Sequence, residues 1–169
     1  VEKFGYGYAD DCALARDVAT MVEEDRAALA AAGEKAPYVL MPHSMSALEA
    51  IYWAHTYPGE IAGIIGLDMA VPASYTSDNS SNIALLRVGT FFGLHRIPLF
   101  SPVNSLGLTA EEYRQSKLLN AKNALDTAVY NECLTVMKKA KTTLGMDVST
   151  VPVLMFTTNL NGAQNSASW

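Results

Sequence analysis

The sequence has 169 residues, half of them apolar, which is enough to bury one sizeable hydrophobic core. A net charge of −5, with the twelve basic residues scattered, argues against nucleic acid and acidic membranes as partners. No apolar run reaches the roughly 18 residues that a membrane span needs, and Cys12 and Cys133 lack metal-ligand spacing, so two free, buried thiols are expected.

The first predicted element is an amphipathic helix over residues 12–32, where apolar residues recur at three- and four-residue spacing. Asp10 and Asp11 are candidate caps for its start, and Gly33 follows its end.

The next segment predicts a unit of strand, helix and strand. Residues 38–41 form a short apolar run that indicates a strand buried on both faces. A helix that is apolar nearly all round is expected over 46–57, and a second buried strand over 61–67, ending at Asp68. This spacing is typical of a crossover in a parallel sheet.

The second half begins with a polar connector over 74–82 and an apolar helix over 83–94, before an irregular stretch with two prolines. Thr109 and Glu112 match a capping box, and one or two helices are expected behind it, up to Gly145.

A third buried strand is predicted over 151–156, before a polar tail. The fold class is therefore α/β, with core segments at 1–73 and 149–169 and a helical insertion at 74–148. So long an insertion exceeds ordinary connection lengths, and we expect it to cover a pocket.

Ser44 is the candidate nucleophile. It lies where the first strand meets its helix, and the residues two before and two after it, Pro42 and Ser46, are compact enough for a sharp, strained turn. The amide of Met45 would open the helix and could donate to an oxyanion. The alternative is that Ser44 merely caps the helix. The strands on either side favour the nucleophile.

These residues resemble a known family. "PHSMSALEAIYWAHTYPGEIAGIIGLDMAVP", residues 42–72, looks like the nucleophile-elbow region of the α/β-hydrolase superfamily, which typically reads G-H-S-M-G-G. "EKFGYGYAD", residues 2–10, is similar to the R-x-G-Y-G-x-S-D-like loop before it, and "VPVLMF" resembles the penultimate core strand. Pro42 and Ser46 depart from the family's two glycines. The resemblance implies a partial parallel-sheet α/β-hydrolase core with an inserted helical cap.

The resemblance implies a serine hydrolase that cleaves a small-molecule ester or amide, with no metal or organic cofactor. Serine at the elbow argues against the epoxide-hydrolase and dehalogenase branches, whose covalent ester needs a carboxylate nucleophile. Asp68 matches the place where some members carry the catalytic acid, although hydrogen bonding to its own turn fits equally well. The family's first strands would precede Val1, and its last strand and catalytic histidine would follow Trp169, so we expect a fragment.

Two further residues are pocket candidates, His43 and Tyr6. His43 adjoins Ser44, but neighbouring side chains on a strand point to opposite faces, so it is not assigned as the base. His55 fits a buried or helix-surface histidine, and His95 a pocket or a solvated loop. The glycine-flanked Tyr6 fits either a loop at a pocket mouth or a purely structural turn.

Two other hypotheses stay open: a non-catalytic hydrolase-like module that binds a small apolar ligand, and an inactive truncated fragment. In the family's strand order, 38–41 and 151–156 would each leave an uncovered sheet edge, and such edges invite self-association.

Overall fold

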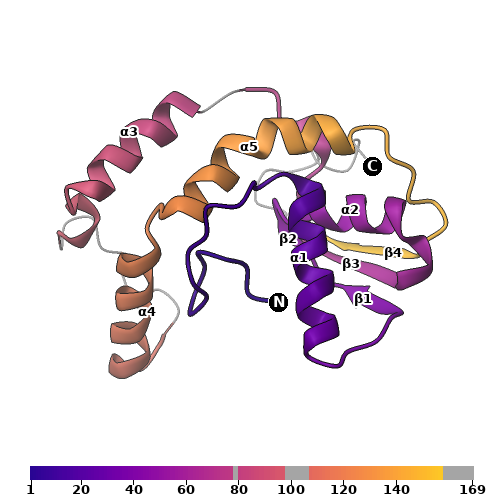
Figure 1. Ribbon diagram of the computed structural model, residues 1–169, viewed down its shortest axis with the longest axis horizontal. Helices are drawn as coiled ribbons and strands as arrows, with labels where there is room; N and C mark the ends of the chain where they lie inside the picture. Colours follow the sequence, from indigo (N-terminus) through magenta and orange to yellow (C-terminus); the bar gives the residue numbers. More distant parts are fainter. Residues whose placement is uncertain (78–79, 98–106, 158–169) are drawn as a thin grey trace. The chain divides into compact units, whose positions relative to one another are not determined.

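The computed structural model describes residues 1–77, 80–97 and 107–157, so most of the proline-containing stretch and nearly all of the polar tail lie outside the described residues. The helices and strands, shown in Figure 1, are α1 (Val18–Ala31), β1 (Tyr38–Leu40), β2 (His43–Ser44), α2 (Ala47–Thr56), β3 (Ile61–Met69), α3 (Ser80–Phe91), α4 (Ala110–Asn123), α5 (Thr127–Thr143) and β4 (Val153–Phe156). Short 3-10 turns follow at η1 (Pro58–Glu60), η2 (Pro72–Ser74) and η3 (Leu94–Arg96).

The chain divides into two compact units. Unit 1 holds residue 1 with 17–77 and 135–169, and unit 2 holds 2–16 and 78–134. This grouping places 2–16 with the helical segment, and the division of the chain into a core and an inserted cap stays a prediction. No helix among the described residues combines the length and the apolar character needed to cross a membrane.

Unit 1 is built on a parallel sheet with β3 at its centre. β1 and β2 pair along one side of β3, and β4 pairs along the other. The expected α/β class and parallel sheet are confirmed. β3 runs to Met69, two residues beyond its predicted end, and so includes Asp68. In the described part of the chain β1 and β4 pair with β3 alone, and self-association through their outer edges stays a prediction.

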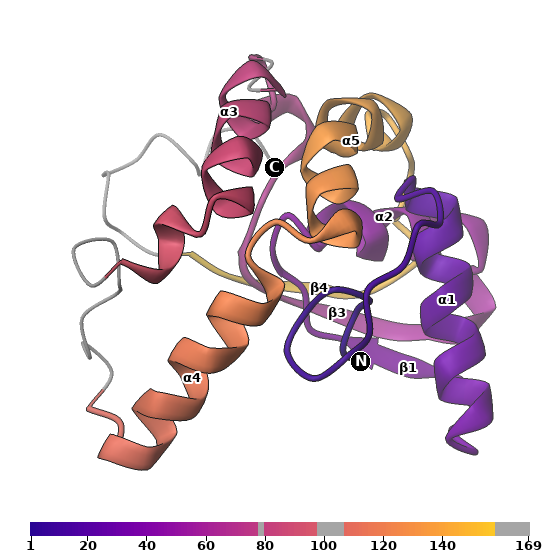
Figure 2. The ribbon, with the colours of Figure 1, turned by 60° about the vertical axis from the view of Figure 1, so that its left-hand side comes forward.

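Helices α1 and α2 lie on the same face of this sheet (Figure 2). α2 is buried nearly all round, because Val22 of α1 packs on one side of it and Ile64 of β3 on the other, around Ile51 and Trp53. The apolar run of α2 in the sequence thus reflects its position in the middle of the core.

The opposite face of the sheet is bare among the described residues. Val39, Met41, Leu154 and Phe156 are each more than half exposed. The expectation that the first strand is buried on both faces is therefore wrong for the described structure, because α1 and α2 cover one face alone.

The start of α1 also differs from the expectation. The helix begins at Val18, where Asp17 accepts a hydrogen bond from the Thr20 amide at 3.1 Å. Asp11 serves another helix, because its carboxylate accepts from the amides of Thr127 and Ala128 at the start of α5, at 3.0 and 2.7 Å. Asp11 thus caps a helix, but that helix is α5, so the prediction that it caps the first helix is wrong.

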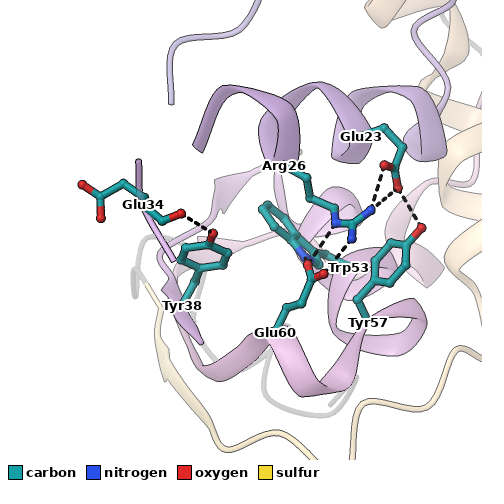
Figure 3. Close-up of polar contacts among 7 residues, drawn as sticks. All are labelled: Glu23, Arg26, Glu34, Tyr38, Trp53, Tyr57 and Glu60. Atoms are coloured by element: carbon teal, nitrogen blue, oxygen red, sulfur yellow. Dashed lines mark hydrogen bonds and ion pairs between the residues drawn. The ribbon is translucent and has the colours of Figure 1, made fainter. Parts of the chain in front are cut away.

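A polar cluster fastens α1 to α2 and η1, as Figure 3 shows. Arg26 donates to Glu60 at 2.6 and 2.9 Å and to Glu23 at 2.8 Å, and it stacks 3.8 Å above the Tyr57 ring. The Trp53 indole N–H donates to Glu60 at 2.9 Å. A fully buried aromatic on α2 thus shares a carboxylate with an arginine on α1.

Unit 2 consists of helices and one anchored loop. α3 begins at Ser80, inside the predicted polar connector, and ends at Phe91. The predicted capping box at the start of α4 is confirmed, since Thr109 and Glu112 bind each other's backbone amides. Two helices, α4 and α5, follow it, and Cys12 and Cys133 are free thiols, both partly exposed rather than buried.

Candidate functional site

Ser44 lies at the turn from β2 into α2 and has φ of +51°. A residue with a side chain rarely adopts this left-handed conformation, which costs on the order of 1–3 kcal/mol and persists where the surroundings enforce it. Here β3 enforces it, because the Leu67 amide donates to Pro42 O at 2.9 Å and the Ala70 amide to Ser44 O at 3.0 Å. Hydrogen bonds to β3 thus hold the backbone of the turn at Pro42 and at Ser44 itself.

Ser46 closes the same turn. Its hydroxyl accepts from the His43 amide at 2.9 Å and donates to His43 O at 2.7 Å. Ser46 is also the N-cap residue of α2, although its side chain makes no capping hydrogen bond. The alternative that Ser44 caps this helix is therefore wrong, since the cap lies two residues later and the Ser44 side chain stays exposed.

The amide of Met45 follows directly. Among the described residues no acceptor is recorded for it, as befits an amide that precedes the first turn of a helix. The partial positive charge at the N-terminus of α2 strengthens the attraction of this amide for an anion. This amide is thus available to a negatively charged oxygen near Ser44.

Asp68 shares the unusual conformation of Ser44, with φ of +48°. Its neighbours in β3, Leu67 and Met69, pair with His43 and Ser44 of β2. Ser44 and Asp68 therefore lie side by side at the carboxyl ends of two adjacent parallel strands, where sites in α/β sheets gather. Asp68 is half-buried.

The three histidines do not complete this arrangement. His43 is exposed on β2. His55 lies at the far end of α2 with Nδ1 2.9 Å from Asp147 O, and the Nε2 of His95, in unit 2, lies 3.2 Å from Ala121 O. Within the described ranges no imidazole is hydrogen-bonded to Ser44.

Tyr6 belongs to unit 2. It lines a pocket of about 550 Å³ together with residues of α4 and the start of α5. The turn that carries it is held by main-chain hydrogen bonds, from the Tyr6 amide to Lys3 O at 3.1 Å and from the Ala9 amide to Tyr6 O at 2.9 Å.

A buried ion pair escaped the sequence analysis. Lys139 of α5 donates to Glu49, in the first turn of α2, at 2.7 Å, and both side chains are almost fully buried. Burial, and then the charge of Glu49, raise the pKa of Tyr75. The sequence did hold a signal for this pair. Glu49 is a lone carboxylate inside an otherwise apolar helix, and a buried carboxylate needs a partner.

Unit 1 also has an apolar pocket of about 470 Å³. Met69 and Val71 line it at the end of β3, with Ile51 of α2 and Met155 of β4. Its lining extends from the strand residue that pairs with Ser44.

No protein-family model matches the sequence. The chain is 38% identical over 144 residues to the uncharacterized protein YbdG of Bacillus subtilis (strain 168), which covers 79% of this chain and 44% of the relative. The chain thus spans less than half the length of this relative.

Two solved structures show the fold. An epoxide hydrolase from Vigna radiata matches 93% of this chain and 61% of its own with a TM-score of 0.62 and 18% identity. A thermophilic esterase from Thermogutta terrifontis matches 90% of this chain and 57% of its own with a TM-score of 0.59 and 18% identity. Both are hydrolases by name. The chain has the α/β-hydrolase fold, of which it comprises a part of the core.

Proposed function

We propose that this chain is the elbow-bearing part of a serine hydrolase that cleaves a carboxylic ester or amide. The observation that carries the proposal is the left-handed backbone of Ser44 on a pinned turn between a strand and a helix. The α/β-hydrolase fold supports hydrolytic chemistry in general, and the neighbours include both an epoxide hydrolase and an esterase. A hydroxyl rather than a carboxylate at this position favours an acyl transfer to serine.

In this proposal Ser44 Oγ attacks the carbonyl carbon of the substrate. The carbonyl oxygen becomes an oxyanion and accepts a hydrogen bond from the Met45 amide, whose lack of a recorded partner among the described residues supports this role. The bond from the carbonyl carbon to the leaving group then breaks, and the alcohol or amine leaves with the proton that the base took from Ser44 Oγ. Water hydrolyses the acyl-serine ester, which releases the acid and restores the hydroxyl.

Asp68 is proposed as the acid that orients the base. Support comes from its position beside Ser44 on the neighbouring strand. The base is assigned to none of the three histidines of this chain. We place it in the part of the longer protein that the chain does not span.

The test is labelling with a fluorophosphonate, in which the serine oxygen bonds to phosphorus and fluoride leaves. Intact-mass spectrometry and peptide mapping would follow the chain, its Ser44→Ala variant and a Ser74→Ala control, with and without added imidazole as an external base. We expect one adduct on Ser44 that imidazole accelerates, no adduct in Ser44→Ala, and an unchanged adduct in Ser74→Ala. A folded chain that stays unlabelled under both conditions would overturn the proposal.

The second candidate is a hydrolase-like module that binds a small apolar ligand without catalysis. Two observations favour it: no imidazole is hydrogen-bonded to Ser44 within the described residues, and the apolar pocket at the end of β3 has about 470 Å³. Binding of a long-chain ester without turnover or serine labelling would support this candidate over the first.

A further inference from the structure

The pocket of unit 2 lies between the loop of residues 5–8, helix α4 and the start of α5. Its volume of about 550 Å³ falls within the range of sites that hold small molecules, roughly 300–1,000 Å³. All of its lining residues belong to unit 2.

The loop wall of this pocket is held in place by hydrogen bonds and close packing. The Asn123 amide group donates to Gly7 O at 2.7 Å, and the Gly5 amide donates to Asp10 O at 2.9 Å. Gly5 has φ of +81°, and a Cβ atom there would lie 2.6 Å from the Asp126 carboxylate. Glycine suits this conformation, whereas a side chain there would be strained, and the hydrogen bonds hold the wall in a preformed shape.

The lining combines two kinds of surface. Leucine and valine side chains of α4, the helix junction and α5 form an apolar part, at Leu119, Leu125 and Val129. Amide and hydroxyl groups that can both donate and accept hydrogen bonds form the polar part, at Tyr6, Tyr8, Gln115, Ser116, Asn120 and Asn123.

Among the described residues, the one charged side chain of the lining is negative. Glu112 is its one ionisable side chain besides the two tyrosines, and no lysine, arginine or histidine lines the pocket among the described residues. The hydroxyl and then the amide of Thr109 lower the pKa of Glu112, so this carboxylate is ionised at neutral pH. A ligand with a negative charge would find no cation there and one anion.

We propose that this pocket binds an uncharged small molecule that joins an apolar ring or chain to amide or hydroxyl groups. The apolar part of the ligand packs on the leucine and valine side, and its polar groups pair with Gln115, Asn120 and Ser116. The site does not depend on the chemistry proposed for Ser44.

N-acetyl-tyrosinamide and N-acetyl-tyrosine make a matched pair of probes, because the first ends in a neutral amide and the second in a carboxylate. Titrations of the whole chain with each probe, followed by NMR chemical shifts, would give the two affinities. We expect saturable binding of the neutral amide and at least about 5-fold weaker binding of the anion, because Glu112 repels it. Glu112→Gln is expected to narrow that difference, which separates the local charge from the net charge of the chain.

Asn120→Leu tests the polar side of the pocket and is expected to weaken amide binding on the order of 5-fold, the value of about one hydrogen bond. Leu118→Ala is the matched control, an exposed side chain on the same helix that does not line the pocket. Gly5→Ala is expected to abolish binding while the helical circular dichroism of the whole chain stays unchanged. No saturable binding of the amide, tighter binding of the anion, or equal losses in Asn120→Leu and Leu118→Ala would each overturn the proposal.

Discussion

The two faces of the sheet in unit 1 differ although the same strands form both. On one face Ile64 is 1% exposed beneath α2, whereas on the other Leu154 is 55% exposed. The strands are apolar in both directions, a composition typical of sheets that are covered on two sides. The strand sequences therefore suit burial on both faces, whereas helices cover one face in the described structure.

The largest effect is expected among the helices of unit 1, where Lys139 of α5 pairs with Glu49 of α2. Lys139→Met would remove the ammonium that binds Glu49 inside the core, and we expect a loss of about 3–5 kcal/mol in the free energy of unfolding. Replacing both residues, as in Lys139→Met with Glu49→Leu, is expected to recover most of this loss, because the desolvation cost of both charges disappears. Urea unfolding measures each variant.

Lys138→Met is the control for this prediction, since Lys138 neighbours Lys139 on α5 but is exposed. We expect it to change the free energy of unfolding by less than about 0.5 kcal/mol. A double variant that is as unstable as Lys139→Met alone would show that side-chain shape, and not the loss of the ion pair, decides the stability at this site.

A smaller effect is expected at Ile64 and Ile65, adjacent residues of β3 whose side chains lie on opposite faces of the sheet. Ile64→Ala removes a side chain packed under α2, and a cost of about 2–5 kcal/mol is expected from lost burial and the cavity. Ile65 is half-buried and pairs with Leu154, so Ile65→Ala should cost less than about 2 kcal/mol. Equal costs in urea unfolding would mean that the second face is also covered in solution and that the two faces do not differ.

Much of unit 1 could be predicted from the sequence. The strand, helix and strand of residues 38–69 followed from short apolar runs and a helix without a polar face, and the parallel pairing followed from the crossover length. Helix starts were less predictable. Asp10, Asp11 and Asp17 are all competent caps, and long-range contacts, here Asp11 with α5, decide which one a helix uses.

Some features of the candidate site also followed from the sequence, and others did not. Sequence spacing placed Ser44 at the turn and Asp68 at the end of the next strand, because both positions follow from local patterns. The Lys139–Glu49 pair did not follow, since it depends on which residues meet across 90 positions of the chain. The left-handed backbone of Asp68 did not follow either, because its local sequence gives no signal of it. The helix-capping alternative for Ser44 was excluded by the position of the actual cap, Ser46.

The smallest effect concerns pH and the cluster that fastens α1 over the covered face. Hydrogen bonding to Arg26 lowers the pKa of Glu60, and hydrogen bonding first to Tyr57 and then to Arg26 lowers that of Glu23. Because both pKa values lie below the unfolded value of 4.5, the stabilisation is complete above pH 4.5 and is lost as the pH falls through the folded values.

Arg26→Met should therefore destabilise the chain at neutral pH, and its difference from the parent chain should shrink in urea unfolding as the pH falls from about 6 to about 3. Arg114→Met removes an exposed pair with Glu111 on α4 and should show a smaller change over the same range, since exposed pairs contribute little. An Arg26→Met difference that stays constant with pH would assign the role of Arg26 to its stacking on Tyr57, a contact that does not need either carboxylate to be charged.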